Sequence, residues 1–521
     1  MKNSLLFFLI ISNISFSQNF ATPEQYHYGT SGWDNPDQTI KCQDNGFLLI
    51  SSSAGNDHDK SQASFGGDDI WVVRLNADKT IRWEKTFGGD QDDKPKYIVE
   101  LASGNILILA DSYSGVSGNK TSVNYGDKDY WVLKLSSAGN KIWEKSFGTS
   151  MAEVPSTILE ISDTNYVIIG GSQGGVSGSK TEASFGGTDI WAIGIDSTGT
   201  ELWQKTYGGN SVDSPMDRLS IKLQNSNVLI LSNSLSGVSG NKNTPNYGSN
   251  DGWVLEISSM NGQIIEENNF GGADIDYLFQ GLQLDGDIYL VGSSRSEVSG
   301  NKQSALHGTT DAWLLKLDQN LNIVSDQSFG GTNASSFKGI SKTDFGMVVY
   351  GVARNDGNPW VAGTVKGAYD AWFVGFDSLG DYQWDFIFGT NTSIDIVNGF
   401  FENSHNNYTF SYSTTSPGND GDLTISSYGS YDLYLIDLTT DLAVLGNSKE
   451  EFVVYPNPVV NSLSISGAKE LSFYEITDLN GKIVSRGNYS GVIDCSPFNQ
   501  GFYTLRITSS DQVFVKKFVK Q

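Results

Sequence analysis

The sequence predicts an all-β protein: a seven-bladed β-propeller closed by its N-terminal strand, followed by a small C-terminal β-sandwich. Three observations lead to this prediction. A motif of the form aromatic-Gly-x-x-Asp-x-Trp recurs seven times, its Asp positions advance by 59 to 62 residues, and each unit reads as four short strands. A fixed period of this size is typical of solenoids and propellers, and it overrides the domain count that a length of 521 residues suggests.

The repeated aspartate marks the seven units. It occurs at Asp69, Asp129, Asp189, Asp251, Asp311, Asp370 and Asp432. The last two copies are degraded, since Lys366 replaces the aromatic residue and Tyr434 replaces Trp. A ring of carboxylates could serve metal binding or acid-base chemistry. We favour a structural role, in which each Asp accepts backbone N–H groups in the turn before the third strand and each Trp packs between blades, because repeat positions mostly encode the stacking of neighbours.

Within a unit the periodicity is that of β-strands. In the second unit we expect strands over residues 97–101, 105–110, 131–135 and 141–147. The second of these is almost continuously apolar, as in a strand buried on both faces, and the fourth alternates apolar and polar residues. No segment carries the periodicity and the caps of a long helix. Four strands in each of seven units describe a seven-bladed propeller.

A second motif predicts how the ring closes. The fourth strands end in an aromatic-Gly pair, 18 or 19 residues after the repeated Asp: Phe87-Gly88, Phe147-Gly148, Tyr207-Gly208, Phe270-Gly271, Phe329-Gly330 and Phe388-Gly389. The seventh unit lacks this pair, and Tyr28-Gly29 near the N-terminus supplies it. We therefore expect the first strand of the chain to complete the last blade, which removes the exposed edges of the sheets.

The N-terminal residues 1–17 have the three parts of a secretory signal peptide. Lys2 is followed by an apolar run over residues 5–14, and Ser15 and Ser17 are the small residues before a cleavage site. No other segment is apolar over the length that a membrane-spanning helix needs, so we expect none in the mature chain. Cys42 and Cys495 are far apart in the sequence, and we expect both to be unpaired, one in each domain.

The C-terminal residues 452–521 differ from the repeats and carry four motifs in order. These are Tyr455-Pro456-Asn457-Pro458, the hairpin segment 478–482 with its Asn480-Gly481 turn, the strand 501–507, and Lys516-Lys517-Phe518. Together they resemble the type A sorting domain of proteins exported by the type IX secretion system of Bacteroidetes. The resemblance implies that residues 452–521 contact the type IX machinery and direct passage across the outer membrane. It also implies removal of this domain, with the rest released or attached to the cell surface.

We therefore divide the chain into a signal peptide (1–17), a propeller (18–440), a linker (441–451) and a sorting domain (452–521). The chain has 59 acidic and 34 basic residues, a formal net charge of −25. This charge opposes binding to nucleic acid or to an anionic membrane surface.

A lysine recurs in the long loop between the second and third strands. It is the last residue of Val-Ser-Gly-Asn-Lys or a related segment and occurs at Lys60, Lys120, Lys180, Lys242 and Lys302. Five lysines on successive blades could form a partial basic ring that binds carboxylate- or sulfate-bearing glycans on the face of the long loops. In the local alternative, each lysine folds back onto loop carbonyls or the nearby Asp. Regular repetition favours this alternative.

The degraded sixth and seventh units suggest two further sites. In the sixth unit the segment 354–360 replaces the lysine loop, and its Trp360 could stack on a sugar or anchor a protein partner. Alternatively, the loop could tuck over the blade. Asn419, Asp420 and Asp422 could offer oxygen ligands to calcium, although the spacing of a calcium loop is absent. We predict no other cofactor.

Catalytic motifs are scarce. The four histidines have no repeated acidic or nucleophilic companion, and there is no nucleophile elbow, zinc motif or phosphate-binding loop. We therefore predict no catalytic residues and hypothesise a non-enzymatic, exported binding module that recognises a glycan or a protein on its long-loop face. The alternative is a secreted hydrolase or lyase that acts on polysaccharide with carboxylates near the propeller axis. A third reading, a quinoprotein-like cofactor site, rests only on the turn over residues 195–203.

Overall fold

The computed structural model describes residues 23–215, 220–354, 360–361, 364–391, 393–439, 453–455, 458–466, 473–477, 482–489, 491–509 and 512–520. The chain forms two units, residues 1–440 and 441–521, and each is treated by itself. The predicted signal peptide and linker lie outside the described residues. All regular elements described are strands.

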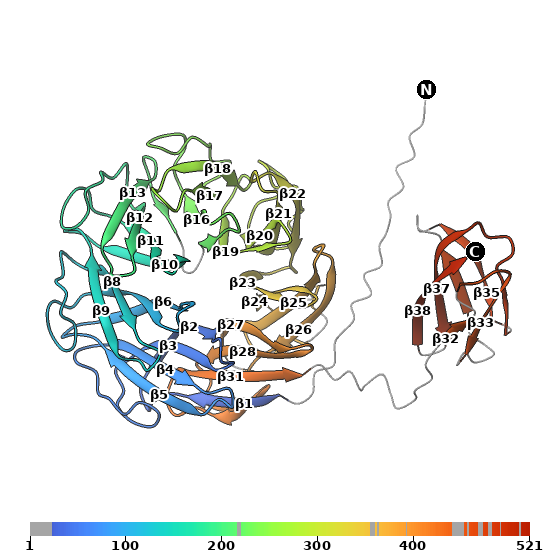
Figure 1. Ribbon diagram of the computed structural model, residues 1–521, viewed down its shortest axis with the longest axis horizontal. Helices are drawn as coiled ribbons and strands as arrows, with labels where there is room; N and C mark the ends of the chain where they lie inside the picture. Colours follow the sequence, from blue (N-terminus) through green and yellow to red (C-terminus); the bar gives the residue numbers. More distant parts are fainter. Residues whose placement is uncertain are drawn as a thin grey trace. The chain divides into compact units, whose positions relative to one another are not determined.

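The first unit is a ring of antiparallel sheets arranged around a central axis (Figure 1). Within its described residues, seven sheets share one plan, with the first strand innermost and the fourth outermost. In the fourth sheet two short strands replace the innermost one, and in the seventh the N-terminal strand is the outermost. The all-β propeller predicted from the repeats is confirmed.

The strands of the first four sheets are as follows. The first sheet contains β2 (Asp34–Lys41), β3 (Phe47–Ser53), β4 (Asp69–Leu75) and β5 (Ile81–Phe87). The second contains β6 (Asp93–Glu100), β7 (Ile106–Ser112), β8 (Asp129–Leu135) and β9 (Lys141–Phe147). The third contains β10 (Glu153–Ser162), β11 (Asn165–Ser172), β12 (Asp189–Asp196) and β13 (Glu201–Tyr207). The fourth contains β14 (Asp213–Ser214) and β15 (Ile221–Lys222), which both pair with β16 (Val228–Ser234), then β17 (Asp251–Ile257) and β18 (Ile264–Phe270).

The remaining three sheets follow the same order. The fifth contains β19 (Asp276–Leu284), β20 (Asp287–Ser294), β21 (Asp311–Leu317) and β22 (Ile323–Phe329). The sixth contains β23 (Ser336–Thr343), β24 (Gly346–Ala353), β25 (Asp370–Asp377) and β26 (Tyr382–Phe388). The seventh contains β27 (Asp395–Ser404), β28 (Asn407–Thr414), β31 (Asp432–Thr439) and β1 (Glu24–Tyr28). Its long loop also carries a small hairpin, β29 (Gly418–Asp420) and β30 (Leu423–Ser426), which the sequence did not predict.

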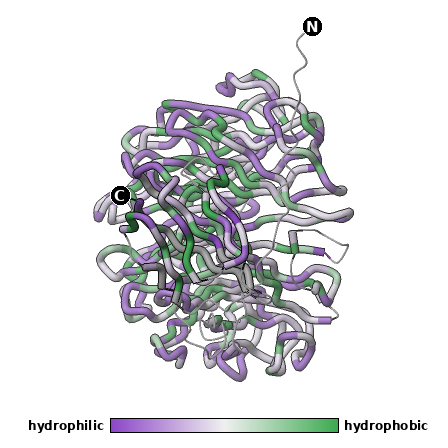
Figure 2. The backbone as a smooth tube through the Cα atoms, turned by 90° about the vertical axis from the view of Figure 1, so that its right-hand side faces the viewer, coloured by the Kyte–Doolittle hydropathy of each residue, from purple (hydrophilic) through white to green (hydrophobic). Residues whose placement is uncertain are grey.

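Burial explains why the middle strands are so apolar. Every residue of β7 and β8 is buried, because each blade is covered on both faces by its neighbours. Trp131 of β8 packs with Ile70, Val72 and Phe87 of the preceding blade, and the equivalent tryptophans of other blades are also fully buried. The outer strand β9 is less buried, and only its last two residues are fully enclosed. Hydrophilic stretches lie mainly at the periphery (Figure 2).

The N-terminal strand belongs to the seventh sheet. β1 pairs with β31 in antiparallel register, with Tyr28 opposite Leu433 and Glu24 opposite Asp437. The first blade contacts the seventh, since β2 lies against both β27 and β31. The strand that the Tyr28-Gly29 pair predicts is therefore found at the edge of the last sheet.

Adjacent blades are fastened by the long loops. In the second blade, Asn119 accepts a hydrogen bond from the N–H of Gly88 at 3.0 Å, and its own N–H donates to the Gly88 carbonyl at 3.0 Å. We call this reciprocal pair the clasp. The closing junction has the same clasp, with Asp59 in place of Asn119 and Gly29 in place of Gly88. The junction between the seventh and first blades is therefore fastened by the same contact as the junction between the first and second.

The second unit is a small β-sandwich. One sheet contains β32 (Val453–Tyr455), β33 (Ser462–Ser466) and β36 (Ile493–Asp494). The other contains β35 (Ile483–Asn488), β34 (Phe473–Thr477), β37 (Gly501–Ser509) and β38 (Gln512–Lys520). Leu463 of the first sheet and Ile476 and Leu505 of the second share one buried core. The predicted hairpin turn over residues 478–481 lies outside the described residues.

Two sequence predictions about the whole chain can be checked here. Cys42 and Cys495 are both buried and unpaired, one in each unit, as expected. In the part of the chain that the structure describes, no helix has the length and hydropathy required to cross a bilayer.

Candidate functional site: the axial cavity

One cavity among the described residues lies on the axis of the propeller. Its volume is about 590 Å³, and it is lined by side chains from the innermost strands β2, β6, β15, β19, β23 and β27 and from β24. These strands converge because each blade presents its first strand to the axis (Figure 1). Concave sites of this size, built from several elements, are where proteins usually bind small ligands.

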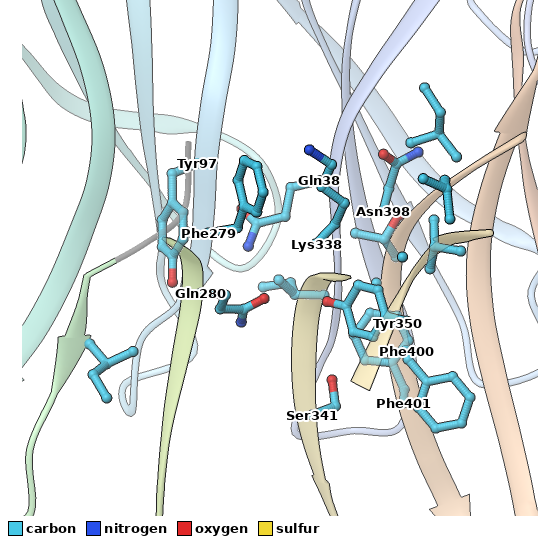
Figure 3. A pocket seen from close by; sticks show the side chains of 18 of the residues that line it. Gln38, Tyr97, Phe279, Gln280, Lys338, Ser341, Tyr350, Asn398, Phe400 and Phe401 are labelled. Atoms are coloured by element: carbon cyan, nitrogen blue, oxygen red, sulfur yellow. The ribbon is translucent and has the colours of Figure 1, made fainter. Parts of the chain in front are cut away.

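Aromatic rings and side-chain amides dominate the wall of this axial cavity. Tyr97, Phe279 and Tyr350 contribute rings, and Gln38 and Gln280 contribute amides. Figure 3 shows these side chains pointing into one space from separate strands. Aromatic faces with neighbouring hydrogen-bonding groups suit the apolar face and the hydroxyl groups of a sugar ring.

No Asp or Glu belongs to the lining of the axial cavity among the described residues. A glycosidase needs two carboxyl groups across the scissile bond. The cavity therefore lacks, in its described part, the acid pair that the hydrolase alternative requires.

Lys338 of β23 is the one cation in the described lining. Its Nζ lies 3.6 Å from the centroid of the Phe279 ring. The side chain is exposed to the cavity, and desolvation by the protein around the cavity lowers the pKa of Lys338 to about 8. The ammonium is still mainly protonated at neutral pH.

A second, smaller cavity of about 360 Å³ adjoins the axial cavity. The two share Phe279, Lys338, Val352 and Tyr369, and Arg295 also lines the smaller one. Ile275 and Tyr369 of this cavity come directly before β19 and β25, on the side of the ring that carries the long loops. We take this cavity as the mouth of the axial cavity. No acidic residue lines it among those described.

The repeated lysines do not form a basic ring, so that prediction is wrong. Lys60, Lys120, Lys180, Lys242 and Lys302 are all buried, with exposed fractions of 0 to 1%. Lys60 Nζ donates to the carbonyls of Ser53 and Gly55 at 2.9 and 2.8 Å. Lys120 donates to the Ser122 carbonyl at 2.9 Å and lies over the Trp131 ring. These lysines fit the alternative in which each one folds back onto its own loop, because the loop closes over each of them.

Trp360 is not an exposed platform either. It is partly buried against the core between the fifth and sixth blades, and its ring meets Phe329 edge-on at a centroid distance of 5.2 Å. Trp33 is the loop tryptophan that is exposed, at 55%, stacked on Tyr431. The position of Trp360 fits the alternative stated from the sequence, in which this loop folds over the blade.

The candidate calcium ligands are used in the clasp of the seventh blade. Asp422 accepts a hydrogen bond from the Gly389 N–H at 3.0 Å and pairs with Lys366, and Asp420 accepts from the Asn391 N–H at 3.0 Å. Asn419 donates to the Ser426 hydroxyl at 2.7 Å. No cluster of three or more His, Cys, Asp or Glu side chains that could hold a metal occurs among the described residues. The structure therefore gives these three residues a structural use and does not bring them together as a cation site.

The seven repeated aspartates accept backbone hydrogen bonds, as the structural interpretation predicts. Asp129 accepts from the Tyr125 N–H at 2.6 Å, and Asp69 accepts from the Phe65 N–H at 2.5 Å. The same contact is made, at 2.5 to 2.8 Å, by Asp189, Asp251, Asp311, Asp370 and Asp432. All seven are fully buried.

A second set of buried acids was missed from the sequence. It comprises Asp34, Asp93, Glu153, Asp213, Asp276 and Asp395, each at the start of an innermost strand. Asp93 accepts a hydrogen bond from the Gly89 N–H at 2.6 Å, in the connection between two blades. A signal was present, since an acid follows the glycine of nearly every aromatic-Gly pair by five or six residues.

Burial raises the pKa of several acids in each set, among them Asp69 and Asp129 of the first and Asp93 and Glu153 of the second. It brings the pKa of Asp69 and of Asp129 to about 7, and the facing Asp93 and Glu153 carboxyls add to the shift. The buried acids therefore belong to the junctions between blades and not to the axial cavity.

Comparison with known proteins gives one family match. The family model of the secretion system C-terminal sorting domain matches residues 453–521. No curated protein matches the sequence.

Solved structures resemble the chain in shape at low identity. The WD40 domain of Neurospora crassa Pan2 is 9% identical, with a TM-score of 0.42, over 82% of this chain and 98% of that one. PorZ, a surface component of the type IX secretion system of Porphyromonas gingivalis, is 10% identical, with a TM-score of 0.26, over 95% and 75%. A thermostable family-43 glycoside hydrolase is 9% identical, with a TM-score of 0.30, over 70% and 96%. The propeller assignment rests on the strand order of the chain itself.

The family match and the four C-terminal motifs agree on where the chain goes. The sandwich that forms the second unit covers the matched residues. Residues 453–521 are a secretion system C-terminal sorting domain, and the chain is a substrate of the type IX secretion system, exported across the outer membrane to the cell surface or the extracellular space.

Proposed function

We propose that this protein is an exported binding protein whose propeller takes an oligosaccharide into its axial cavity. The observation that supports it is a cavity of about 590 Å³ lined by aromatic rings and amides, with no acidic residue in its described lining. Rings and amides bind sugars, whereas hydrolysis of a glycosidic bond calls for two carboxyl groups. A concave site also suits a glycan chain better than a flat protein surface.

The cavity would be reached from the long-loop face. Trp33, Ile275 and Ile394 each stand directly before an innermost strand on this side, and Trp33 and Ile394 are 55% and 52% exposed. The apolar side chains at the entrance would not compete for the hydroxyl groups of a sugar chain. These groups would stay available for hydrogen bonds with the amides deeper in the cavity.

A cavity-filling substitution tests the proposal. Ser341 of β23 lines the axial cavity, so Ser341→Trp should fill part of it and Ser341→Ala should leave it open. The full chain is screened on a glycan array, and each hit is titrated by calorimetry with both variants. We expect Ser341→Trp to abolish binding and Ser341→Ala to retain it.

Two outcomes would contradict the proposal. A folded Ser341→Trp variant, with unchanged circular dichroism, that binds every hit like the parent would place the ligand elsewhere. Release of reducing ends from a bound polysaccharide would show the hydrolase alternative instead.

A further inference from the structure

Lys338 has no acidic partner in the structure. Among the described residues, no carboxylate forms an ion pair within 4.0 Å of its Nζ, which lies over the Phe279 ring. A charged ammonium that is partly removed from water normally lies next to a counter-charge. The absence of one from so acidic a chain makes Lys338 the unusual feature of the axial cavity.

The equivalent lysine of the second blade shows the contrast. Lys96 lies in β6, three residues after the buried Asp93. Lys338 lies at the equivalent position of β23, three residues after Ser335. Lys96 Nζ lies 3.7 Å from a carboxylate oxygen of Asp37 in the neighbouring strand β2. At the position of Asp37, β19 of the fifth blade carries Phe279, so Lys338 faces an aromatic ring where Lys96 faces an acid.

Two side-chain amides line the same cavity as this ammonium. The side-chain oxygen of Gln38 accepts from the Ile98 N–H at 2.7 Å, and that of Gln280 accepts from the Ile340 N–H at 3.3 Å. These bonds fix both amides with their oxygens toward the backbone. Neither Nε2 group donates to a described residue, and both side chains line the axial cavity (Figure 3). Gln38 and Gln280 thus offer donors to a cavity that also holds a cation, since the acceptor of each of these two amides is already in use.

The mouth adds more positive charge. Arg295 lines it and donates from Nε to the Thr310 hydroxyl at 3.3 Å. The Arg354 guanidinium lies 5.4 Å from the centroid of the Tyr369 ring, which lines both cavities. A chain with a net charge of −25 therefore has a path from its long-loop face that is cationic along its described lining.

We infer that the axial cavity binds an acidic oligosaccharide, with a carboxylate or sulfate group on Lys338, Gln38 and Gln280 and the sugar rings against Phe279, Tyr97 and Tyr350. This inference rests on the proposed function and names its ligand class. An ammonium beside two fixed N–H donors complements an oxyanion, and burial in the cavity strengthens that attraction. The aromatic rings distinguish the ligand from a free inorganic anion, which would not contact them.

Three probes test the charge of the ligand. Galacturonate trisaccharide carries carboxylates, its methyl ester has the same skeleton without charge, and a sulfated galactose disaccharide carries the other anion. Each is titrated into the full chain at pH 6.5 by calorimetry. We expect one of the two acidic probes to bind at least tenfold more tightly than the ester, and the pair of results tells a carboxylate from a sulfate.

The matched variants are Lys338→Met and Lys342→Met. Both lysines lie on β23, and Lys342 lies outside the lining of the axial cavity. In Lys338→Met, the loss of a charged hydrogen bond should weaken the affinity for the acidic probe about tenfold to a hundredfold. Lys342→Met should bind like the parent, and binding of the ester should change little in either variant.

The pH dependence gives an independent readout. Because the pKa of Lys338 is lowered to about 8, the parent should lose affinity for the acidic probe between pH 7 and pH 9.5. Lys338→Met should show no such loss. Equal affinity of the ester and the acidic probes, unchanged in Lys338→Met, would overturn the acidic ligand and leave the proposed function standing. If Ser341→Trp also binds every array hit unchanged, the proposed function fails as well.

Discussion

At the scale of the residue, the repeated lysine shows how one motif admits opposite roles. Val116 in the loop that ends in Lys120 is 64% exposed, whereas Lys120 itself is 1% exposed. From hydropathy alone, the valine is expected to be buried and the lysine to be exposed. The lysine is buried because its ammonium finds a loop carbonyl and the Trp131 ring inside the blade, contacts that no pattern of residue types reveals.

Replacement of Lys120 by methionine should therefore destabilise the propeller. The loop carbonyl of Ser122 loses its donor, and the buried Asp93 and Asp129 lose the positive charge nearest to them. We expect a loss of about 1–3 kcal/mol in the free energy of unfolding, measured by urea titration. The loss should be larger at pH 8, above the pKa of about 7 of Asp129, than at pH 5. The exposed Lys145→Met serves as the control. Equal stability of Lys120→Met and the parent at both pH values would refute the structural role.

At the scale of the element, the long loops decide how blades join. Gly118 lies at the bend of the second loop with φ of +55°, and a Cβ added there would stand 2.4 Å from the Gly88 carbonyl of the preceding blade. The clasp of Asn119 onto Gly88 depends on this close approach. The strands themselves followed from the sequence, since the apolar runs of β7 and β8 match their complete burial.

Two alanine substitutions in one loop separate these effects. Gly118→Ala forces a side chain against backbone at a positive φ, so it should cost roughly 1–3 kcal/mol of stability. Gly115→Ala meets no atom within 4 Å and should be neutral or stabilise by about 0.4–1 kcal/mol, because it restricts the unfolded chain. The two midpoints of thermal unfolding are compared by calorimetry. Equal midpoints would contradict the importance of the close approach.

At the scale of the whole molecule, buried acids form a continuous feature of the ring. Each of the first five blades carries one lysine and two acids, and an acid of one blade can raise the pKa of an acid in the next, as Asp93 does for Asp69. One carboxyl oxygen of Asp69 and one of Asp129 accept no hydrogen bond among the described residues. The neutral form of these carboxyls is therefore favoured in the folded protein.

The stability of the propeller should fall as the pH rises from 5 to 8. Folding raises the pKa of Asp69 and Asp129 to about 7, above the usual value of 3.8, so protonation favours the folded state. This stabilisation is full below pH 3.8 and is lost as the pH passes through 7. Each carboxyl contributes up to about 1.4 kcal/mol for each unit of its shift. Calorimetric melting from pH 5 to 8 measures the effect.

The matched control for this pH effect is a pair of isosteric variants. Asp129→Asn keeps a side-chain acceptor for Tyr125 and removes the titrating group, so its melting point should depend less on pH. The exposed Asp163→Asn should follow the parent. If the melting point of the parent rises toward pH 8, the predicted effect of the buried carboxyls is contradicted.

The sequence by itself determined the propeller, its closing strand and the sorting domain, because each follows from contacts that repeat at a fixed period or from a contiguous motif. Tyr28-Gly29 could be placed at the end of β1 because six other pairs end their strands in the same way. Only the tertiary structure decided the site. Gln38, Phe279 and Lys338 come from three blades and meet at the axis, and no periodicity encodes them, since the lining differs from blade to blade. The orientation of a lysine toward solvent or toward its own loop is likewise set by packing, whose energy depends on neighbours that the chain brings together only on folding.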